Sequence, residues 1–449
     1  MVPLIAAVLC LAFVAYLFRT DPRQEGSSTS ALWIPFLWMF FAGSRYLSSW
    51  LSFSSAESFS YDEGSPLDRM LFLALIAAGV VVLVRRNVPW GRFMAGNKLL
   101  LLYFAYCLLS VLWADEPDIS FKRWIKDLGN PVMVLVILTE PAPLPALATL
   151  LRRLTYLLIP LSVLFVRWFP ELGRVYGADG TPMYTGVGQQ KNALGQMCLW
   201  IGIYLAWQIL LDRDRFAAWT RAQRANMLVL AVLMAYLLYV SNSQTSLACL
   251  LLAVAVILVA RLGFVRRRPR ALNDIVLVSA LLVLALESTI GLREHVLDLL
   301  GRDPSLTNRA DLWALLLEFS TSPVLGAGFM SFWTGERMEA IWERLGAGVL
   351  QAHSGYIEQY LNLGYVGLGI TMLLLIATFF RLRGEMRRDR PFATLRLCFL
   401  CAAALYNYTE AAFFGITNMW IVLLLALIPA HTLARRATAP TLREAAAHS

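Results

Sequence analysis

The sequence predicts an all-α membrane protein, a polytopic bundle of about 12–13 transmembrane helices that forms a single integral membrane domain over residues 1–449. Three observations lead to this prediction. The chain is 58% hydrophobic and only 15% charged, which excludes an ordinary soluble enzyme. Apolar runs long enough to cross a bilayer recur along the chain. Arginines cluster beside the ends of these runs, and alternate loops lack such a cluster.

The apolar runs give the expected spans in order. The first run lacks a basic leading segment and a small-residue cleavage site, so we expect a retained first helix. The runs near 152–166 and 226–260 are short, which is typical of tilted or re-entrant segments. The runs that predict membrane helices are 2–18, 32–49, 67–84, 97–113, 128–146, 152–166, 188–211, 226–241, 245–260, 273–289, 356–380, 391–406 and 414–434.

The net charge of +9 orients the chain in a membrane and does not indicate nucleic acid as a partner. The arginine-rich loops are expected to face the cytoplasm and to contact anionic membrane lipid, with the C-terminus inside and, by parity, the N-terminus outside. The clusters are Arg85, Arg86 and Arg92; Arg213, Arg215, Arg221 and Arg224; Arg261, Arg266, Arg267, Arg268 and Arg270; Arg381, Arg383, Arg387, Arg388 and Arg390; and Arg435 and Arg436. The expected outer loops are 50–66, 114–127, 167–187, 290–355 and 407–413.

The outer loop 290–355 is the longest polar segment and the only candidate for structure outside the membrane. Apolar residues at helical spacing predict a helix over 308–319, which Pro323 and the glycines of 326–328 would end. A second short helix is expected near 335–346. A loop of this length is functional more often than not, and we expect a periplasmic lid over a lipid headgroup, with a simple packing cover as the alternative.

His353 closes this loop and stands at the mouth of a hydrophobic helix. Because histidine exchanges a proton near neutral pH, this position favours a catalytic base at a membrane surface. Glu410 lies near the outer end of another helix, where a carboxylate is functional or ion-paired. Pairing with Arg309 or a lysine would serve structure alone, and the sequence leaves the two interpretations open.

Lysine occurs at four positions, and three of these are conspicuous. Lys191 stands at the expected start of a spanning helix, where a cation opposes the helix dipole unless an anion binds there. With Asn192 beside it, this position favours a phosphate site over a lysine that snorkels to the headgroups. Lys122 and Lys126 lie one turn apart on the outer side, which indicates an anionic lipid substrate or ordinary surface charge.

Two further polar segments have simpler interpretations. The stretch 241–246 lies between two apolar runs, where serine and threonine satisfy a tight hairpin at least as often as they contact a substrate. Asp212 and Asp214 have the D-x-D spacing of metal-dependent glycosyltransferases but lie among arginines on the expected cytoplasmic side, so we interpret them as solvated charge. The outer segments contain no clustered carboxylates suited to Mg²⁺, so neither a metal nor another cofactor is implied.

Several motifs resemble those of O-antigen ligases and related bacterial oligosaccharyltransferases and exopolysaccharide polymerases. The family pattern is His, then Asn, Ser or Gln, nine free residues, Gly, two free residues, and Gly, Thr or Tyr, and the chain matches it at His353, Ser354, Gly364 and Gly367. The segment 306–313 resembles the family's Thr-Gly-Arg and Leu/Ile-Trp loop motif, with Asn308 in place of the glycine. The segments 190–195 and 62–69 resemble further family motifs, and 243–245 resembles Ser-Arg/Lys-Thr except that Gln244 replaces the basic residue.

This resemblance implies a GT-C-like bundle in the bacterial inner membrane that acts on its periplasmic face. Such proteins transfer a glycan from undecaprenyl diphosphate to an acceptor hydroxyl, with inversion and without a metal. The acceptor is lipid A–core sugar in the ligase interpretation, which we place first, and a growing polysaccharide in the polymerase interpretation. Protein serine or threonine serves in other members.

The residues fit this chemistry on their own terms. The diphosphate leaving group gains negative charge in the transition state, which Arg309 as a bidentate partner and Lys191 as a second cation would stabilise. His353 would accept the proton of the acceptor hydroxyl, and Glu410 or Tyr356 would orient the imidazole or the sugar. A flippase or transporter of the lipid-linked glycan is the alternative outside the enzymes, but the polar residues lie on one face and no internal repeat is visible.

Overall fold

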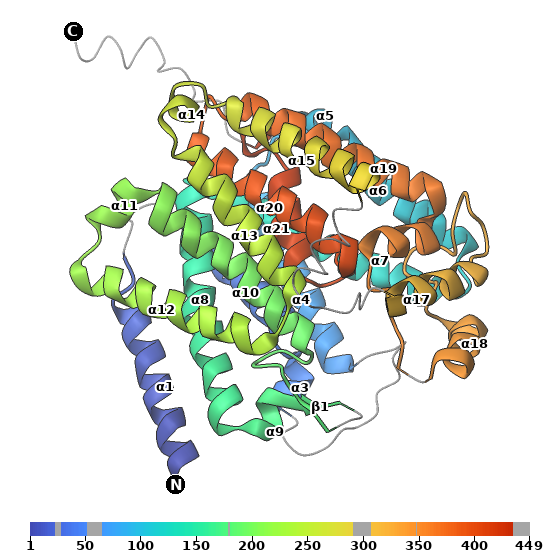
Figure 1. Ribbon diagram of the computed structural model, residues 1–449, viewed down its shortest axis with the longest axis horizontal. Coiled ribbons are helices and arrows are strands. Elements are labelled where there is room, and N and C mark those ends of the chain that lie inside the picture. The colour runs from blue at the N-terminus through green and yellow to red at the C-terminus, as the bar shows by residue number, and fades with distance from the viewer. Residues whose placement is uncertain (23–27, 52–64, 178–179, 291–306, 347, 434–449) are drawn as a thin grey trace.

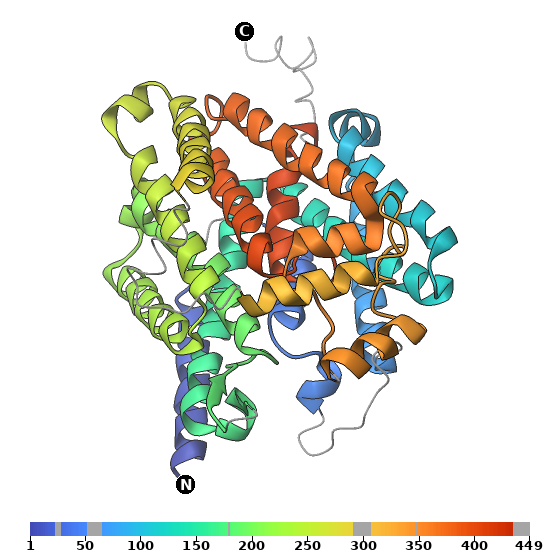
Figure 2. The same ribbon diagram turned by 45° about the vertical axis from the view of Figure 1, so that its right-hand side comes forward.

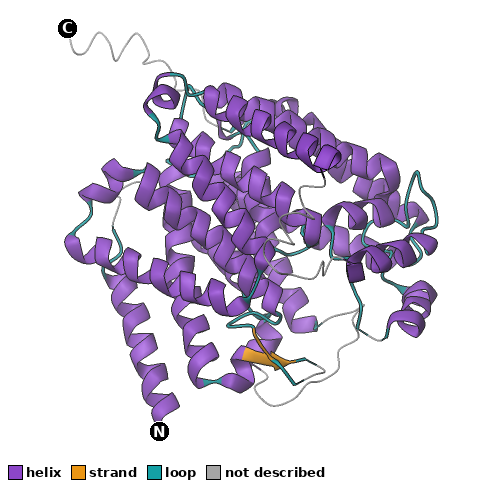
Figure 3. Ribbon diagram, viewed as in Figure 1, coloured by secondary structure: helices purple, strands orange, loops and turns teal. Residues whose placement is uncertain are grey.

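The computed structural model describes residues 1–22, 28–51, 65–177, 180–290, 307–346 and 348–433. Figure 3 shows that this part of the chain is almost entirely helical, with one small β-hairpin. The first half contains α1 (Val2–Arg19), η1 (Ser30–Leu32), α2 (Trp33–Gly43), α3 (Leu47–Leu51), α4 (Pro66–Arg85), α5 (Trp90–Gly96), α6 (Lys98–Leu109), η2 (Ser110–Trp113), α7 (Pro117–Leu138), α8 (Pro143–Trp168), α9 (Pro170–Gly173), β1 (Arg174–Tyr176) and β2 (Pro182–Tyr184).

The second half adds the helices that form most of the site. They are α10 (Lys191–Ala206), the π-helical η3 (Trp207–Leu211), α11 (Arg213–Ala218), α12 (Arg221–Ser241), α13 (Gln244–Ala260), α14 (Gly263–Arg267), α15 (Ala271–Ile290), α17 (Thr307–Glu318), α18 (Gly335–Leu345), α19 (Gly355–Glu385), α20 (Arg390–Thr409), α21 (Asn418–Leu427) and η4 (Ala430–Thr432).

The all-α polytopic class is confirmed, and each expected apolar run overlaps a helix. Among the described residues, seven helices are long and apolar enough to span a membrane: α1, α4, α8, α10 with η3, α12, α15 and α19. The α5–α6 pair, bent by 87°, is an eighth candidate. Adding the three shorter apolar helices, α2, α13 and α21, gives 11 candidates, so the expected count of about 12–13 also requires α7 or α20 to cross.

The sharpest break between helices lies at a place that the sequence did not single out. The run 152–166, expected to be short, belongs to α8, a helix of 26 residues that is largely buried. The bend occurs at Asn97, between α5 and α6, where the amide side chain donates to the carbonyl of Phe93 at 2.8 Å. The run 97–113 is thus one arm of an angled pair.

The bundle has a buried centre and exposed outer helices. Every residue of α21 is buried, and α20 packs against α13, α19 and α21. Helices α1 and α15 are by contrast only 11% buried over their most apolar windows. Because most of their exposed residues are apolar, these two helices present the surface expected to face lipid.

The two ends of the molecule differ. Figure 1 shows α5 and α14 at one end and α9, β1 and α3 at the other. The short strands pair antiparallel, with Val175 opposite Met183, and α10 begins shortly after β2. Helix α20 begins at Arg390 in an arginine-rich segment and ends at Thr409, so its last turn lies far from that segment. The first residue of the chain lies at the β-hairpin end.

The described part of segment 290–355 forms the two expected helices, α17 and α18, and this prediction is confirmed. Residues 291–306 lie outside the described residues. Figure 2 shows α17 lying across the C-terminal helices, with α18 beside it. A small hydrophobic core of its own joins this segment to the start of α19, and it contains Leu316, Ala327, Phe332, Trp333, Ile341, Ala352 and Leu361.

Gly364 interrupts α19 and shows why a glycine occupies this position. Its φ of 62° and ψ of −166° lie in a region that is essentially restricted to glycine. A Cβ atom there would lie 2.2 Å from the carbonyl oxygen of Val324. The break exposes backbone groups, and the amides of Tyr365 and Val366 donate to the carbonyls of Pro323 and Val324 at 2.8 and 3.2 Å. The glycine thus seats the loop 323–328 against α19.

Candidate functional site

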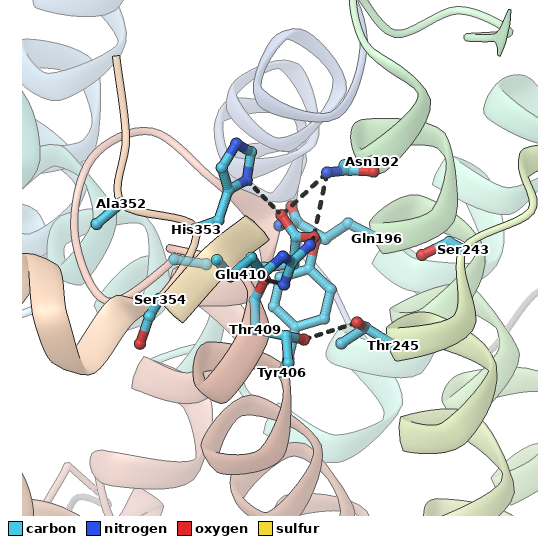
Figure 4. A network of polar contacts seen from close by, with 12 residues as sticks. Asn192, Gln196, Ser243, Thr245, Ala352, His353, Ser354, Tyr406, Thr409 and Glu410 are labelled. Atoms are coloured by element: carbon cyan, nitrogen blue, oxygen red, sulfur yellow. Dashed lines mark hydrogen bonds and ion pairs between the residues drawn. The ribbon is translucent and has the colours of Figure 1, made fainter. Parts of the chain in front are cut away.

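Glu410 is the centre of a polar network drawn from four distant segments of the chain (Figure 4). It follows the last residue of α20 and its side chain is 9% exposed. Its Oε1 accepts from Arg309 Nη2 at 3.2 Å, and both carboxylate oxygens lie within 3.1 Å of Asn192 Nδ2. His353 Nδ1 lies 3.7 Å from Oε2. One carboxylate therefore contacts an arginine, an amide and an imidazole.

The imidazole of His353 has one protected and one accessible side. Its Nδ1 is buried, faces Glu410 and has no hydrogen-bond partner among the described residues, whereas 34% of the side chain is exposed. Figure 4 shows the second ring nitrogen pointing away from Glu410. A carboxylate that faces Nδ1 stabilises an imidazolium by its charge, while Nε2 remains available for a proton. Such contacts are often long without substrate and tighten when it binds.

The backbone around His353 is held against the end of α20. His353 has φ of +50°, the left-handed conformation that a non-glycine residue adopts only when its surroundings enforce it. The amide of Gly355 donates to the carbonyl of Glu410 at 2.8 Å. A Cβ on Gly355 would lie 2.0 Å from Asn407 Oδ1, so only glycine permits this approach. These contacts place His353 and Glu410 in one rigid unit.

Arg309 projects from α17 to the same carboxylate, so the predicted Arg309–Glu410 pairing is present in the structure. Its Nη1 also donates to the carbonyl of Thr409. The Arg309 side chain is 27% exposed, and its charge is paired with that of Glu410. An anion that reaches Arg309 must share it with this carboxylate. The pair joins α17 to the end of α20, and the same carboxylate faces His353.

Lys191 is the first residue of α10 and directly precedes Asn192 of the network. The helix begins there as expected, and no side chain caps its first turn. Lys191 is exposed and makes no ion pair with the described residues. Free N–H groups at a helix start, with a cation beside them, are suited to an anion. The structure thus brings Lys191 next to the network without a direct contact.

Two threonines and a glutamine–tyrosine pair complete the network and did not stand out in the sequence as site residues. Thr245 Oγ1 lies 2.6 Å from Thr409 Oγ1, and Gln196 Nε2 lies 3.4 Å from the hydroxyl of Tyr406. The available signal was position: Thr245 belongs to the polar stretch 241–246, and Thr409 precedes Glu410. Only the structure shows that these side chains point toward one another from different helices.

Four of the expected supporting residues lie apart from Glu410. Gln244 is exposed and donates to Asn242 Oδ1 at 3.1 Å. The hydroxyl of Tyr356 donates to the carbonyl of Ala404 at 2.9 Å, which ties α19 to α20. The ammonium group of Lys126 stands 5.4 and 5.3 Å from the ring centroids of Tyr46 and Phe72. Lys122 is exposed and has no contact with the network.

The acidic side chains outside the Glu410 network bear on a metal site and on the expected D-x-D and early motifs. No three histidine, cysteine, aspartate or glutamate side chains gather among the described residues as a metal ion would require. Asp212 Oδ2 lies 3.6 Å from Arg215 Nη1 and its side chain is only 11% exposed, so Asp212 is a partly buried ion-pair partner, whereas Asp214 is exposed as expected. Asp62, Glu63 and Gly64 of the early motif lie outside the described residues, whereas Asp68 is buried and accepts from the amide of Ser48 at 2.9 Å.

Comparison with known families gives one match. Residues 229–372 match the family model described as O-antigen ligase. The matched segment runs from α12 into α19, so it contains Thr245, Arg309 and His353, while Asn192 and Glu410 lie outside it. No curated protein has a significant sequence match to the chain.

Proposed function

We propose that the chain is a member of the O-antigen ligase and polymerase superfamily, which the O-antigen ligase match over residues 229–372 supports, and that it is a metal-independent, inverting glycosyltransferase. It moves a glycan from undecaprenyl diphosphate to an acceptor hydroxyl. The acceptor is lipid A–core sugar, as in O-antigen ligases. A polymerase that lengthens a polysaccharide with the same donor is the alternative.

The observation that carries this proposal is the meeting of His353 and Arg309 on Glu410. The acceptor oxygen attacks the anomeric carbon, its proton passes to His353 Nε2, and the bond to the diphosphate oxygen breaks. A single direct displacement inverts the anomeric centre. Glu410 stabilises the imidazolium as it forms, and Arg309 with Lys191 stabilises the charge that develops on the diphosphate.

We place the site on the periplasmic side of the bacterial inner membrane. Helix α20 starts in the arginine-rich segment 381–390 and ends at the Glu410 network. By the positive-inside rule the arginine-rich end faces the cytoplasm, so the network faces the opposite side. Undecaprenyl-diphosphate glycans with completed repeats are presented on that side in the reaction that the family resemblance implies.

The test is transfer in liposomes that contain the purified protein and an undecaprenyl-diphosphate-linked glycan. Wild type is compared with His353→Ala and Arg309→Ala, and with Arg344→Ala as a control, because Arg344 forms an exposed ion pair with Glu318 on the same segment. We expect transfer to lipid A–core in wild type and the control, with losses in the other two variants.

Each other outcome has a defined meaning. Lengthening of the lipid-linked glycan, without transfer to lipid A–core, would establish the polymerase alternative. Full activity of His353→Ala would disprove the base assignment. Movement of the glycolipid across the bilayer that neither substitution affects, with no transfer to any acceptor, would replace the enzyme by a transporter.

A further inference from the structure

The residue directly before His353 is held by hydrogen bonds to two side chains that the proposed reaction does not use. Ala352 is fully buried. Its carbonyl oxygen, which belongs to the peptide bond joining it to His353, accepts from Trp313 Nε1 at 2.7 Å. Its amide donates to Glu358 Oε1 at 2.6 Å. Ala352 is thus fixed on both sides, from α17 and from α19.

Glu358 is itself held in place by a closed set of donors. Its side chain lies in the interior, 3% exposed, and both carboxylate oxygens are 3.1 Å from Trp333 Nε1. Asn362 Nδ2 donates to Oε2 at 3.2 Å, and Asn362 Oδ1 accepts from the amide of Phe332 at 3.1 Å. A buried carboxylate with this many donors is a rigid reference point for the Ala352 amide.

These hydrogen bonds to Ala352 matter because the backbone conformation of His353 is unfavourable. His353 stands in the left-handed region at φ +50°, a conformation that persists only when the surrounding contacts over-determine it. On one side of the residue, Gly355 is bonded to the carbonyl of Glu410. On the other side, Ala352 is bonded to Trp313 and Glu358. Without the second anchor the chain can relax toward φ below zero, which would turn the imidazole away from Glu410.

We propose that Trp313 and Glu358 are positioning residues for His353, and that Trp313 couples the two halves of the site. Trp313 and Arg309 are four residues apart on α17, so they share one face of that helix. Through this face α17 contacts the Glu410 carboxylate with Arg309 and the peptide before His353 with Trp313. The position of Arg309, which would bind the diphosphate, and the orientation of His353 therefore both depend on α17. This inference rests on the proposed function, because it assumes that His353 is the base.

The experiment compares two tryptophans of the same segment. Trp313→Phe removes the indole N–H and keeps an aromatic ring. Trp342→Phe is the matched control, because Trp342 Nε1 donates to the carbonyl of Val349 at 2.8 Å and both tryptophans are half-buried. Each variant leaves one carbonyl without its donor, so similar shifts in Tm are expected. Of the two tryptophans, only Trp313 forms a hydrogen bond to the residue before His353.

We expect Trp313→Phe to lower kcat on the order of 10-fold without raising the donor KM, because misplacement of a reacting group by 1 Å costs about 100-fold. Trp342→Phe should keep kcat close to that of wild type, because its hydrogen bond holds Val349 and not the residue before His353. Glu358→Gln, which retains the shape but loses one acceptor, should repeat the kcat loss and guards against a Trp313 variant that fails to fold.

The inference is overturned if the two tryptophan variants have equal kcat, or if Trp313→Phe raises the donor KM and leaves kcat intact, since it would then act through Arg309 alone. His353→Ala, measured in the same assay, distinguishes a failure of the proposed base from a failure of the positioning proposal. If that variant transfers at the wild-type rate, the proposed base fails. If it is slow while Trp313→Phe and Glu358→Gln are normal, only the positioning proposal fails.

Discussion

Replacing Glu410 by glutamine tests the centre of the network with the least change in shape. The amide keeps one acceptor oxygen, so Asn192 retains a partner, but the negative charge beside Arg309 and His353 is lost. Two consequences follow in opposite directions. The imidazolium that forms during transfer loses its counter-charge, and Arg309 loses the carboxylate that competes with a diphosphate for its guanidinium. We therefore expect kcat to fall while the donor KM stays constant or falls.

The magnitude follows from the 3.7 Å distance between His353 Nδ1 and Glu410 Oε2. Opposite unit charges about 4 Å apart attract by about 4 kcal/mol at an effective dielectric constant of 20 and by about 1 kcal/mol in water. Because a third of the His353 side chain is exposed, a value between these limits applies. About 2 kcal/mol of lost transition-state stabilisation corresponds to a kcat about 30-fold lower.

The assay is single-turnover and steady-state transfer from the lipid-linked glycan in liposomes, with kcat and KM reported separately. Glu318→Gln is the control, because Glu318 pairs with Arg344 at 3.0 Å on the surface and its side chain is 64% exposed. An exposed pair of this kind contributes about 1 kcal/mol or less to stability, so Glu318→Gln should transfer at the wild-type rate. A Glu410→Gln enzyme with wild-type kcat and a raised donor KM would refute the reasoning, since Glu410 would then serve only to hold Arg309.

Three further predictions follow from the same contacts. Lys191→Ala should raise the donor KM about 10-fold through loss of a charged contact, with Tm unchanged because Lys191 is exposed; an unchanged KM would contradict its phosphate role. Lys126→Ala should leave the donor KM unchanged, because its ammonium group lies over aromatic rings and away from Glu410, and a large rise in KM would show otherwise. Gly364→Ala should destabilise the fold by about 2 kcal/mol or more in thermal unfolding, whereas Gly369→Ala, where a Cβ meets nothing within 4 Å, serves as the neutral control.

Hydropathy and charge were sufficient to predict the class of fold, because both are properties of single segments. Runs such as 2–18 and 67–84 became α1 and α4 almost unchanged. Helix breaks depend instead on what packs beside the chain. The break of α19 at Gly364 is stabilised by backbone hydrogen bonds to the loop 323–328, and the α5–α6 bend at Asn97 by a hydrogen bond to the carbonyl of Phe93; hydropathy indicates neither feature. The count of spans is uncertain from sequence for the same reason.

The candidate site was also predictable only in part from the sequence. The sequence singled out His353, Asn192 and Glu410 as polar groups at apolar helix ends and Arg309 through its resemblance to the family's loop motif, and the structure brings these four together. Residue type alone could not separate Gln244 from its neighbour Thr245, of which only the threonine reaches α20. Trp313 and Glu358 position His353 indirectly, because both form their hydrogen bonds to Ala352, the residue before it. Such indirect roles appear only when the backbone path is known.

The geometry of Glu410 also suggests how the site keeps its charges balanced during transfer. Before the reaction the carboxylate neutralises Arg309, which lies 3.2 Å away, and the imidazole is 3.7 Å from the other oxygen. When the diphosphate leaves, it draws on Arg309, and in the same step His353 takes up the acceptor proton and becomes a cation. Glu410 can then exchange one partner for the other with little movement, so a buried carboxylate is never left without a counter-charge. This exchange predicts that donor and acceptor bind with positive coupling. A non-hydrolysable diphosphate lipid that binds Arg309 should therefore increase the affinity of the wild-type protein for the acceptor. The Glu410→Gln variant should not show this increase.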